Sequence, residues 1–98
     1  MPKVYIINKN YYDYSSAGQY GTLITLTKGS MNRFDTDEMF RQFTAGFHDS
    51  NPDDCIIMGG MAIMSSIAIS IFAFKHGKVN LLLWRSKTQR YEKRTITL

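Results

Sequence analysis

The sequence predicts a small α/β protein with a mixed sheet, the element order β-β-α-β-α-β-β, and two helices, one of them nearly fully buried. Residues 55–74 form a run of twenty uncharged residues, which Gly59 and Gly60 divide into a part of strand length and a part of helix length. On both sides of this run lie short segments rich in β-branched and aromatic residues, which are typical of strands. With 98 residues, we expect one domain covering 1–98.

The first two elements are short strands. Residues 4–7 and 22–27 are rich in β-formers, and the segment 8–21 between them, with its glycines, serines and tyrosines, indicates a loop with packing of its own. Residues 28–33 have the composition of a turn.

A helix should follow this turn. Asp35 or Thr36 can serve as its N-cap, and Asp35 with Glu38 has the spacing of a capping box. The helix should end near His48, and one face should be apolar through Met39, Phe40, Phe43 and Phe47.

The second half of the chain repeats the pattern of strand and helix. Residues 54–58 resemble a strand covered on both faces, and residues 61–74 a helix ended by Gly77 in the left-handed conformation. Residues 79–84 and 90–98 should pair as a hairpin. Strands joined through helices usually run parallel, so the sheet should be mixed.

A membrane-spanning helix is the alternative interpretation of residues 55–74, because about twenty apolar residues cross a bilayer. If the chain turns at Gly59 and Gly60, however, the remaining helix is only about 21 Å long. The flanking strands would also lose most of their core. We therefore expect no membrane association.

The net charge of +4 is unevenly distributed. Residues 1–74 carry a balance of −2, whereas residues 75–98 carry +6. A basic end suggests an anionic partner, but the same charges also suit a solvated edge strand that resists aggregation. Both interpretations remain open.

The carboxyl ends of the predicted parallel strands form the first candidate site. Ligands of such sheets bind beyond these ends, and a helix that starts after two glycines offers backbone N–H groups to an anion. The alternative is a simple tight turn. The residues expected to hold a phosphate-bearing small molecule are Gly59, Gly60, Lys28, Asn32, Arg33, Arg85 and Lys87.

A cluster of four tyrosines, Tyr11, Tyr12 and Tyr14 with Tyr20 nearby, forms the second candidate site. Exposed tyrosines stack on bases, and beside basic strands they would bind single-stranded nucleic acid. The alternative is that the tyrosines fold the loop down onto the protein, which we expect of at least two of them. The residues concerned are Tyr11, Tyr12, Tyr14, Arg90, Lys93 and Arg94.

The chain shows little that suggests catalysis. The two histidines are distant in sequence, Cys55 follows two acidic residues that disfavour a thiolate, and no spacing suits zinc. We expect a binding protein rather than an enzyme, with no cofactor and no metal. Trp84 and three methionines, Met58, Met61 and Met64, are interpreted as core residues rather than as ligand-binding residues.

Several segments together resemble small proteins of bacteriophages and mobile elements, namely residues 12–14, 21–29, 32–37, 53–59 and 77–84. The resemblance implies an accessory protein in the host cytoplasm that binds a host protein or a nucleotide signal of host immunity, with a possible counter-defence role. We also expect a homo-oligomer, because the helix at 61–74 has more apolar surface than one small sheet can cover.

Overall fold

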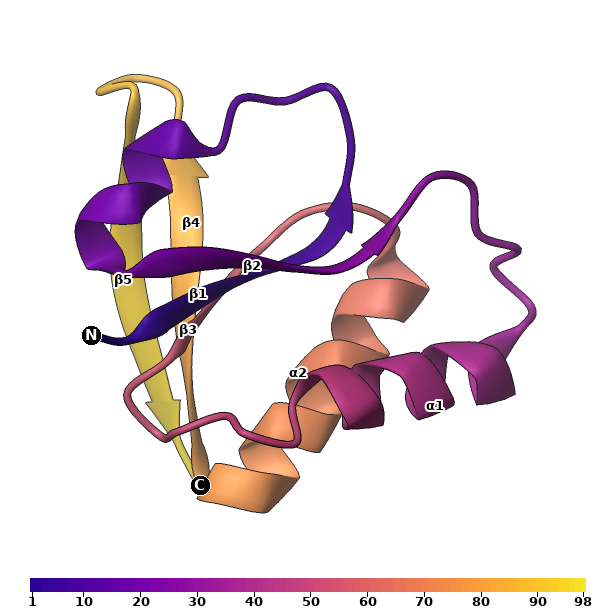
Figure 1. Cartoon of the computed structure of the whole chain (residues 1–98). Helices are drawn as coiled ribbons and strands as arrows, with labels where there is room; N and C mark the ends of the chain where they lie inside the picture. Colours follow the sequence, from indigo (N-terminus) through magenta and orange to yellow (C-terminus); the bar gives the residue numbers. More distant parts are fainter.

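The computed structural model describes residues 1–98 and contains one five-stranded sheet in the order β2-β1-β3-β4-β5 (Figure 1). Strands β1 to β4 run parallel, and β5 is antiparallel to β4. The predicted fold class and element order are confirmed, and a 3-10 helix, η1, is added within the expected loop. The elements are β1 (Lys3–Lys9), η1 (Ser15–Tyr20), β2 (Thr22–Lys28), α1 (Thr36–Gly46), β3 (Cys55–Ile57), α2 (Ala62–His76), β4 (Lys78–Arg85) and β5 (Arg90–Thr97).

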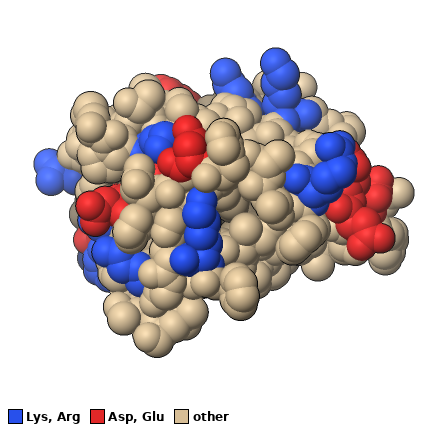
Figure 2. Space-filling view, turned by 60° about the horizontal axis from the view of Figure 1, so that its bottom comes forward, with Lys and Arg blue, Asp and Glu red and all other residues tan.

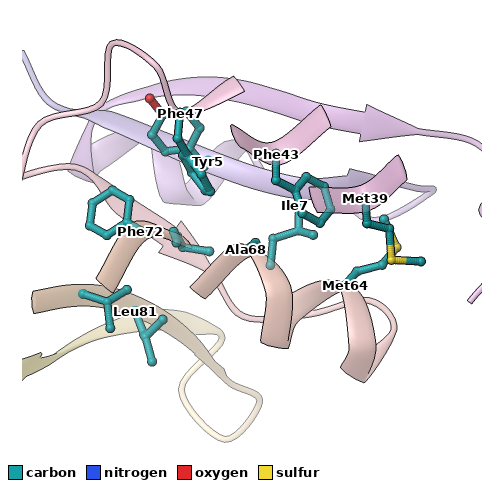
Figure 3. Packing of buried hydrophobic residues seen from close by; sticks show 11 residues of the cluster. Tyr5, Ile7, Met39, Phe43, Phe47, Met64, Ala68, Phe72 and Leu81 are labelled. Carbon is teal, nitrogen blue, oxygen red and sulfur yellow. The ribbon is translucent and has the colours of Figure 1, made fainter. Parts of the chain in front are cut away.

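Both long helices lie on one face of the sheet, where they cover the main core. Successive side chains of a strand point to opposite faces, so Tyr5 and Ile7 of β1 meet the helices while their neighbours point away. Tyr5 packs edge-on against Phe47 at 4.8 Å between ring centroids, and Phe47 packs likewise on Phe72 at 5.6 Å (Figure 3). The aromatic rings therefore join β1, the end of α1 and α2.

The opposite face of the sheet has a thinner cover, made by η1 and its tyrosines. Its buried residues come from β1, β3, β4, the edge strand β5 and η1, and are Val4, Ile6, Ala17, Cys55, Ile57, Leu82 and Tyr91. Tyr14 and Tyr20 pack against this cluster, and the Tyr20 hydroxyl donates to the Tyr91 carbonyl at 3.0 Å. Two tyrosines thus fold down as expected.

The start of α1 differs from the predicted capping box. Asp35 is the N-cap, but its side chain makes no capping hydrogen bond. The Glu38 carboxylate instead pairs with Arg41, one turn further along the helix, and accepts from Gln42. The capping box is therefore wrong, because Glu38 has partners closer at hand within the helix.

The second helix, α2, ends as predicted but is less buried than expected. Gly77 adopts φ 72°, and its N–H donates to the Ala73 carbonyl at 2.8 Å. Four residues of α2 are buried, whereas Phe74 is 92% exposed. The sheet and α1 cover only part of its circumference, which leaves the outer side to solvent. None of the helices is long and apolar enough to cross a membrane.

A buried polar network closes the amino ends of the strands. The Asp54 carboxylate, 1% exposed, accepts from the backbone N–H groups of Lys3 and Asn51, both at 2.8 Å. The Asn80 amide donates to the carbonyls of Pro52 and Asp54, and its oxygen accepts from the Thr95 hydroxyl. These bonds join β1, β4, β5 and the loop before β3.

The chain changes direction across the sheet between β1 and β3. From β1 it moves outward to β2 through η1 on one face, then crosses back over β1 to β3 through α1 on the other face. In open α/β sheets, the crevice outside the carboxyl ends at such a reversal is the usual place for a ligand.

Candidate functional site

A hollow of about 680 Å³ lies at this reversal, and we call it the aromatic pocket. Its walls come from the loop after β1 and the start of η1, from the end of β3 with the following loop, and from the β4–β5 hairpin (Figure 1). A volume of this size is typical of small-molecule sites. The lining residues are Tyr12, Asp13, Tyr14, Ser15, Ser16, Ile57, Met58, Gly59, Gly60, Trp84, Gln89 and Tyr91.

Four aromatic rings from three segments dominate this lining. Trp84 and Tyr91 are opposite each other on β4 and β5, and their rings meet edge to face at 5.0 Å. Trp84 remains 46% exposed, while Tyr91 is buried beneath it. Tyr12 and Tyr14 bring two more rings from the loop after β1. Such rings offer flat apolar faces on which a planar ligand can stack.

The polar groups of the pocket come mainly from the loop after β1. The Ser15 N–H donates to Asp13 Oδ1 at 2.9 Å, and hydrogen bonds from Ser15 hold the pKa of Asp13 below its usual value. Asp13 is therefore a carboxylate at neutral pH. The Tyr14 hydroxyl donates to Asn10 Oδ1 at 2.7 Å, which fixes its ring, and burial raises the pKa of Tyr14.

The loop between β3 and α2 forms one rim of the pocket. Gly60 has φ 81°, a left-handed conformation that favours glycine, whereas Gly59 does not. The Ser65 hydroxyl of α2 donates back to the Gly59 carbonyl at 2.9 Å. No side chain caps the start of α2, so its first N–H groups keep their hydrogen-bonding capacity.

The structure places the five polar and basic residues predicted to join Gly59 and Gly60 outside the hollows beside these glycines. The two main hollows that border these glycines include none of Lys28, Asn32, Arg33, Arg85 and Lys87. Arg85 pairs with Glu92, and the Arg33 guanidinium lies over the Phe34 ring. Lys28 ends β2, and Asn32 and Arg33 follow it. Strand β1 separates β2 from β3, and two strand spacings amount to about 10 Å.

The basic residues of the second predicted site lie on the edge strand β5. Arg90, Lys93 and Arg94 border a separate hollow of about 970 Å³, together with Tyr20 and Tyr91. Glu92 lies among them and pairs with Arg94 at 3.6 Å, which reduces the local positive charge. On the face in Figure 2, basic side chains are scattered, and several lie beside acidic ones.

The predicted tyrosine cluster divides in the structure. Tyr12 and Tyr14 line the aromatic pocket, while Tyr11 beside them is fully exposed and does not line it. The Gly59-Gly60 loop and the tyrosine loop, which the sequence suggested as two sites, therefore border one pocket.

Sequence reasoning placed Arg85 and Lys87 of the hairpin at this end of the sheet but missed the aromatic rings that the hairpin contributes. Trp84, interpreted as a core residue, is half-exposed in the pocket, so that interpretation is wrong. It lies near the end of β4 on the same face as Leu82 and Tyr91, where η1 and its tyrosines leave the sheet partly uncovered. The sequence did contain a sign of this aromatic pair. The alternation of residues 90–98 predicts a hairpin with the preceding strand, and such a hairpin can place Tyr91 opposite Trp84.

One polar cluster outside the pocket joins residues that are distant in sequence. Ser50 Oγ and His76 Nε2 are 2.8 Å apart, and Lys75 Nζ donates to Ser50 Oγ at 3.2 Å. Ser50 is buried and borders none of the main hollows. The cluster lies at the amino end of the sheet, where it ties the end of α2 to the loop after α1.

The whole chain has a counterpart among phage proteins. The family described as Phage Pam3 gp32-like protein matches residues 2–98, so the chain belongs to this family. The resemblance to phage proteins is thereby confirmed. No curated protein and no solved structure matches the chain.

Proposed function

We propose that this member of the Phage Pam3 gp32-like family acts by binding a nucleotide, or another small molecule with a nucleoside unit, in the aromatic pocket. The position of the pocket carries the proposal. It lies outside the carboxyl ends of β1, β3 and β4, where the direction of the chain reverses.

The lining of the pocket supports a nucleoside more than a simple anion. The rings of Tyr12, Tyr14 and Trp84 suit a base, because every base has a face for stacking. The carboxylate of Asp13 can accept from ribose hydroxyls, as acidic residues do in dinucleotide sites. A phosphate would lie toward the start of α2, where N–H groups and the helix dipole favour negative charge.

Sequestration is the mode of action that fits such a site in a phage protein. A nucleotide held in this pocket is withdrawn from its receptor. If the ligand is a nucleotide signal of host immunity in the host cytoplasm, its withdrawal would give the protein a counter-defence role. Isothermal titration calorimetry with adenosine, adenosine monophosphate, a cyclic dinucleotide and inorganic phosphate tests this proposal. The nucleoside-containing probes should bind, and phosphate alone should bind much more weakly.

Two adjacent tyrosines provide the matched variants. Tyr12→Ala should weaken nucleotide binding by about 5- to 150-fold, because losing one base–aromatic stack costs roughly 1–3 kcal/mol. Tyr11→Ala should change binding less than about twofold, since Tyr11 does not line the pocket. Equal affinities of both variants, or no heat with any nucleotide, would overturn the proposal.

Binding of single-stranded nucleic acid is a second candidate, supported by Tyr91. This residue borders both the aromatic pocket and the basic hollow along β5, so one strand could place a base in the first and phosphates along the second. Fluorescence anisotropy with a labelled oligothymidylate should then rise at low salt, with affinity falling steeply as salt increases. Lys93→Glu should reduce the signal, and an unchanged anisotropy would exclude this function.

A further inference from the structure

We propose that the outer face of α1 and α2 binds a second copy of this chain, forming a two-fold dimer in which Phe74 of each copy fills the groove of the other. The groove between the two helices, here the helix groove, has a volume of about 820 Å³. Its outward-facing residues include Phe40, Thr44, Ile67, Ser70, Ile71 and Phe74.

The projecting ring and the hollow lie on the same face of the molecule. Phe74 is 92% exposed and Phe40 is 57% exposed, and both border the helix groove. A two-fold interface uses the same patch on both subunits, so it requires a surface that carries both partners of each contact. The helix groove with Phe74 beside it meets this requirement. Each dimer would contain two equivalent contacts, each made by Phe74 of one copy in the helix groove of the other.

The two serine hydroxyls of the groove already have partners within the chain. The Ser66 hydroxyl donates to the Ala62 carbonyl at 2.8 Å, and the Ser70 hydroxyl to the Ser66 carbonyl at 2.6 Å. The groove therefore presents mostly carbon to its surroundings. An apolar side chain can therefore cover these two serines without leaving their hydroxyls unpaired.

The charges at the two ends of this face favour a second copy in the antiparallel orientation. Both helices return the chain from the carboxyl to the amino end of the sheet, so they run in the same direction. Asp35 and Asp37 lie at the start of α1 and make no ion pair. At the other end, Lys75 donates to the carbonyls of Phe47 and His48 and has no acidic partner.

A two-fold axis through the groove reverses the helices of one copy against those of the other. The acidic start of α1 then lies opposite the Lys75 end of the partner, and the arrangement occurs twice. The excess positive charge of the chain does not oppose this contact, because most of it lies on β4 and β5. The aromatic pocket is not part of the face and remains open in the dimer.

Sedimentation velocity of the purified full chain tests the dimer. The wild type should sediment as a species of twice the 11.3 kDa chain mass. Phe74→Asp should raise the dimer dissociation constant by about 30-fold or more, as expected for the loss of a central anchor. Its circular dichroism should match the wild type, because Phe74 is outside the core. Tyr11→Asp, at a fully exposed ring that does not line the groove, should leave the dimer intact.

A cysteine near the proposed axis provides a second measurement. Ser70→Cys should give a disulfide-linked dimer under mild oxidation, because the native Cys55 is buried and does not compete. Ser30→Cys, in an exposed loop, should not. A wild type that stays monomeric at high concentration would overturn the proposal, as would a dimer that Phe74→Asp leaves unchanged.

Discussion

The two ends of the sheet are stabilised in different ways. At the amino end, Asp54 and Asn80 join segments that are 26 to 51 residues apart through buried hydrogen bonds. At the carboxyl end, the side chains that line the aromatic pocket bond only within their own loops, as Tyr14 does with Asn10 and Gln89 with Ser86. One end therefore carries a large share of the fold's specificity, and the other is free to carry a ligand.

Gly21 at the amino end should give the largest effect on stability. A Cβ at this position would lie 2.2 Å from the Pro2 carbonyl oxygen, which accepts from the Thr22 N–H at 2.9 Å. Gly21→Ala should therefore lower the free energy of unfolding by about 3 kcal/mol in urea titrations. Gly18→Ala is the matched control, because a Cβ there meets nothing within 4 Å. Equal losses at both positions would contradict the structure of this end.

Substitution of Asn80 should have the next largest effect on stability, because its side chain joins β4 to β5 and to the loop before β3 at the amino end of the sheet. Asn80→Ala removes the donor to two carbonyls and the acceptor of the Thr95 hydroxyl, and we expect a loss of about 2 kcal/mol. Asn10→Ala in the pocket loop should cost less than about 1 kcal/mol, since Asn10 is exposed. A larger loss of free energy of unfolding for Asn10→Ala than for Asn80→Ala would show that the carboxyl end of the sheet, not the amino end, contributes more to stability.

His76, at the amino end of the sheet, should make the stability of the protein decrease in acid. Burial and the neighbouring Lys75 ammonium lower the pKa of His76 below its ordinary value of 6.5. The unfolded chain therefore takes up this proton more readily than the folded protein. Its contribution to the free energy of unfolding should be complete above about pH 6.5 and decline as the pH falls below that value. Urea midpoints between pH 7.5 and 5 should show this decline, and His76→Gln should flatten it.

Gly59 at the carboxyl end should give the smallest effect. Its backbone needs no left-handed conformation and a Cβ would meet nothing within 4 Å, so Gly59→Ala should range from no change to a gain of about 1 kcal/mol. Gly60→Ala, at φ 81°, should cost about 1 kcal/mol. Equal free energies of unfolding for the two variants would contradict the left-handed conformation of Gly60 in the loop between β3 and α2.

Local patterns predicted most of the fold. The β-branched runs identified the strands, and Gly59-Gly60 and Gly77 marked the boundaries of α2. The burial of α2 was overestimated, because its uniform apolarity does not reveal how much of its circumference the neighbouring elements cover. Residue Phe74 is as apolar as Phe72, yet one is exposed and the other buried.

The site could be predicted only in pieces. The rim loops at Met58–Gly60 and after β4 were placed at the correct end of the sheet, because that follows from parallel strands. That the loop after β1 also reaches this pocket depends on β1 being the neighbour of β3, and periodicity does not encode strand order. Trp84 was misjudged for the same reason, since its exposure depends on where the covering layers end.

Trp84 is the chain's single tryptophan, and it stands in the wall of the aromatic pocket. Its fluorescence therefore originates from one location, half in contact with water and half with Tyr91. The wavelength of its emission and the quenching of its fluorescence by iodide should therefore report whether a ligand covers Trp84, with no label attached to the protein.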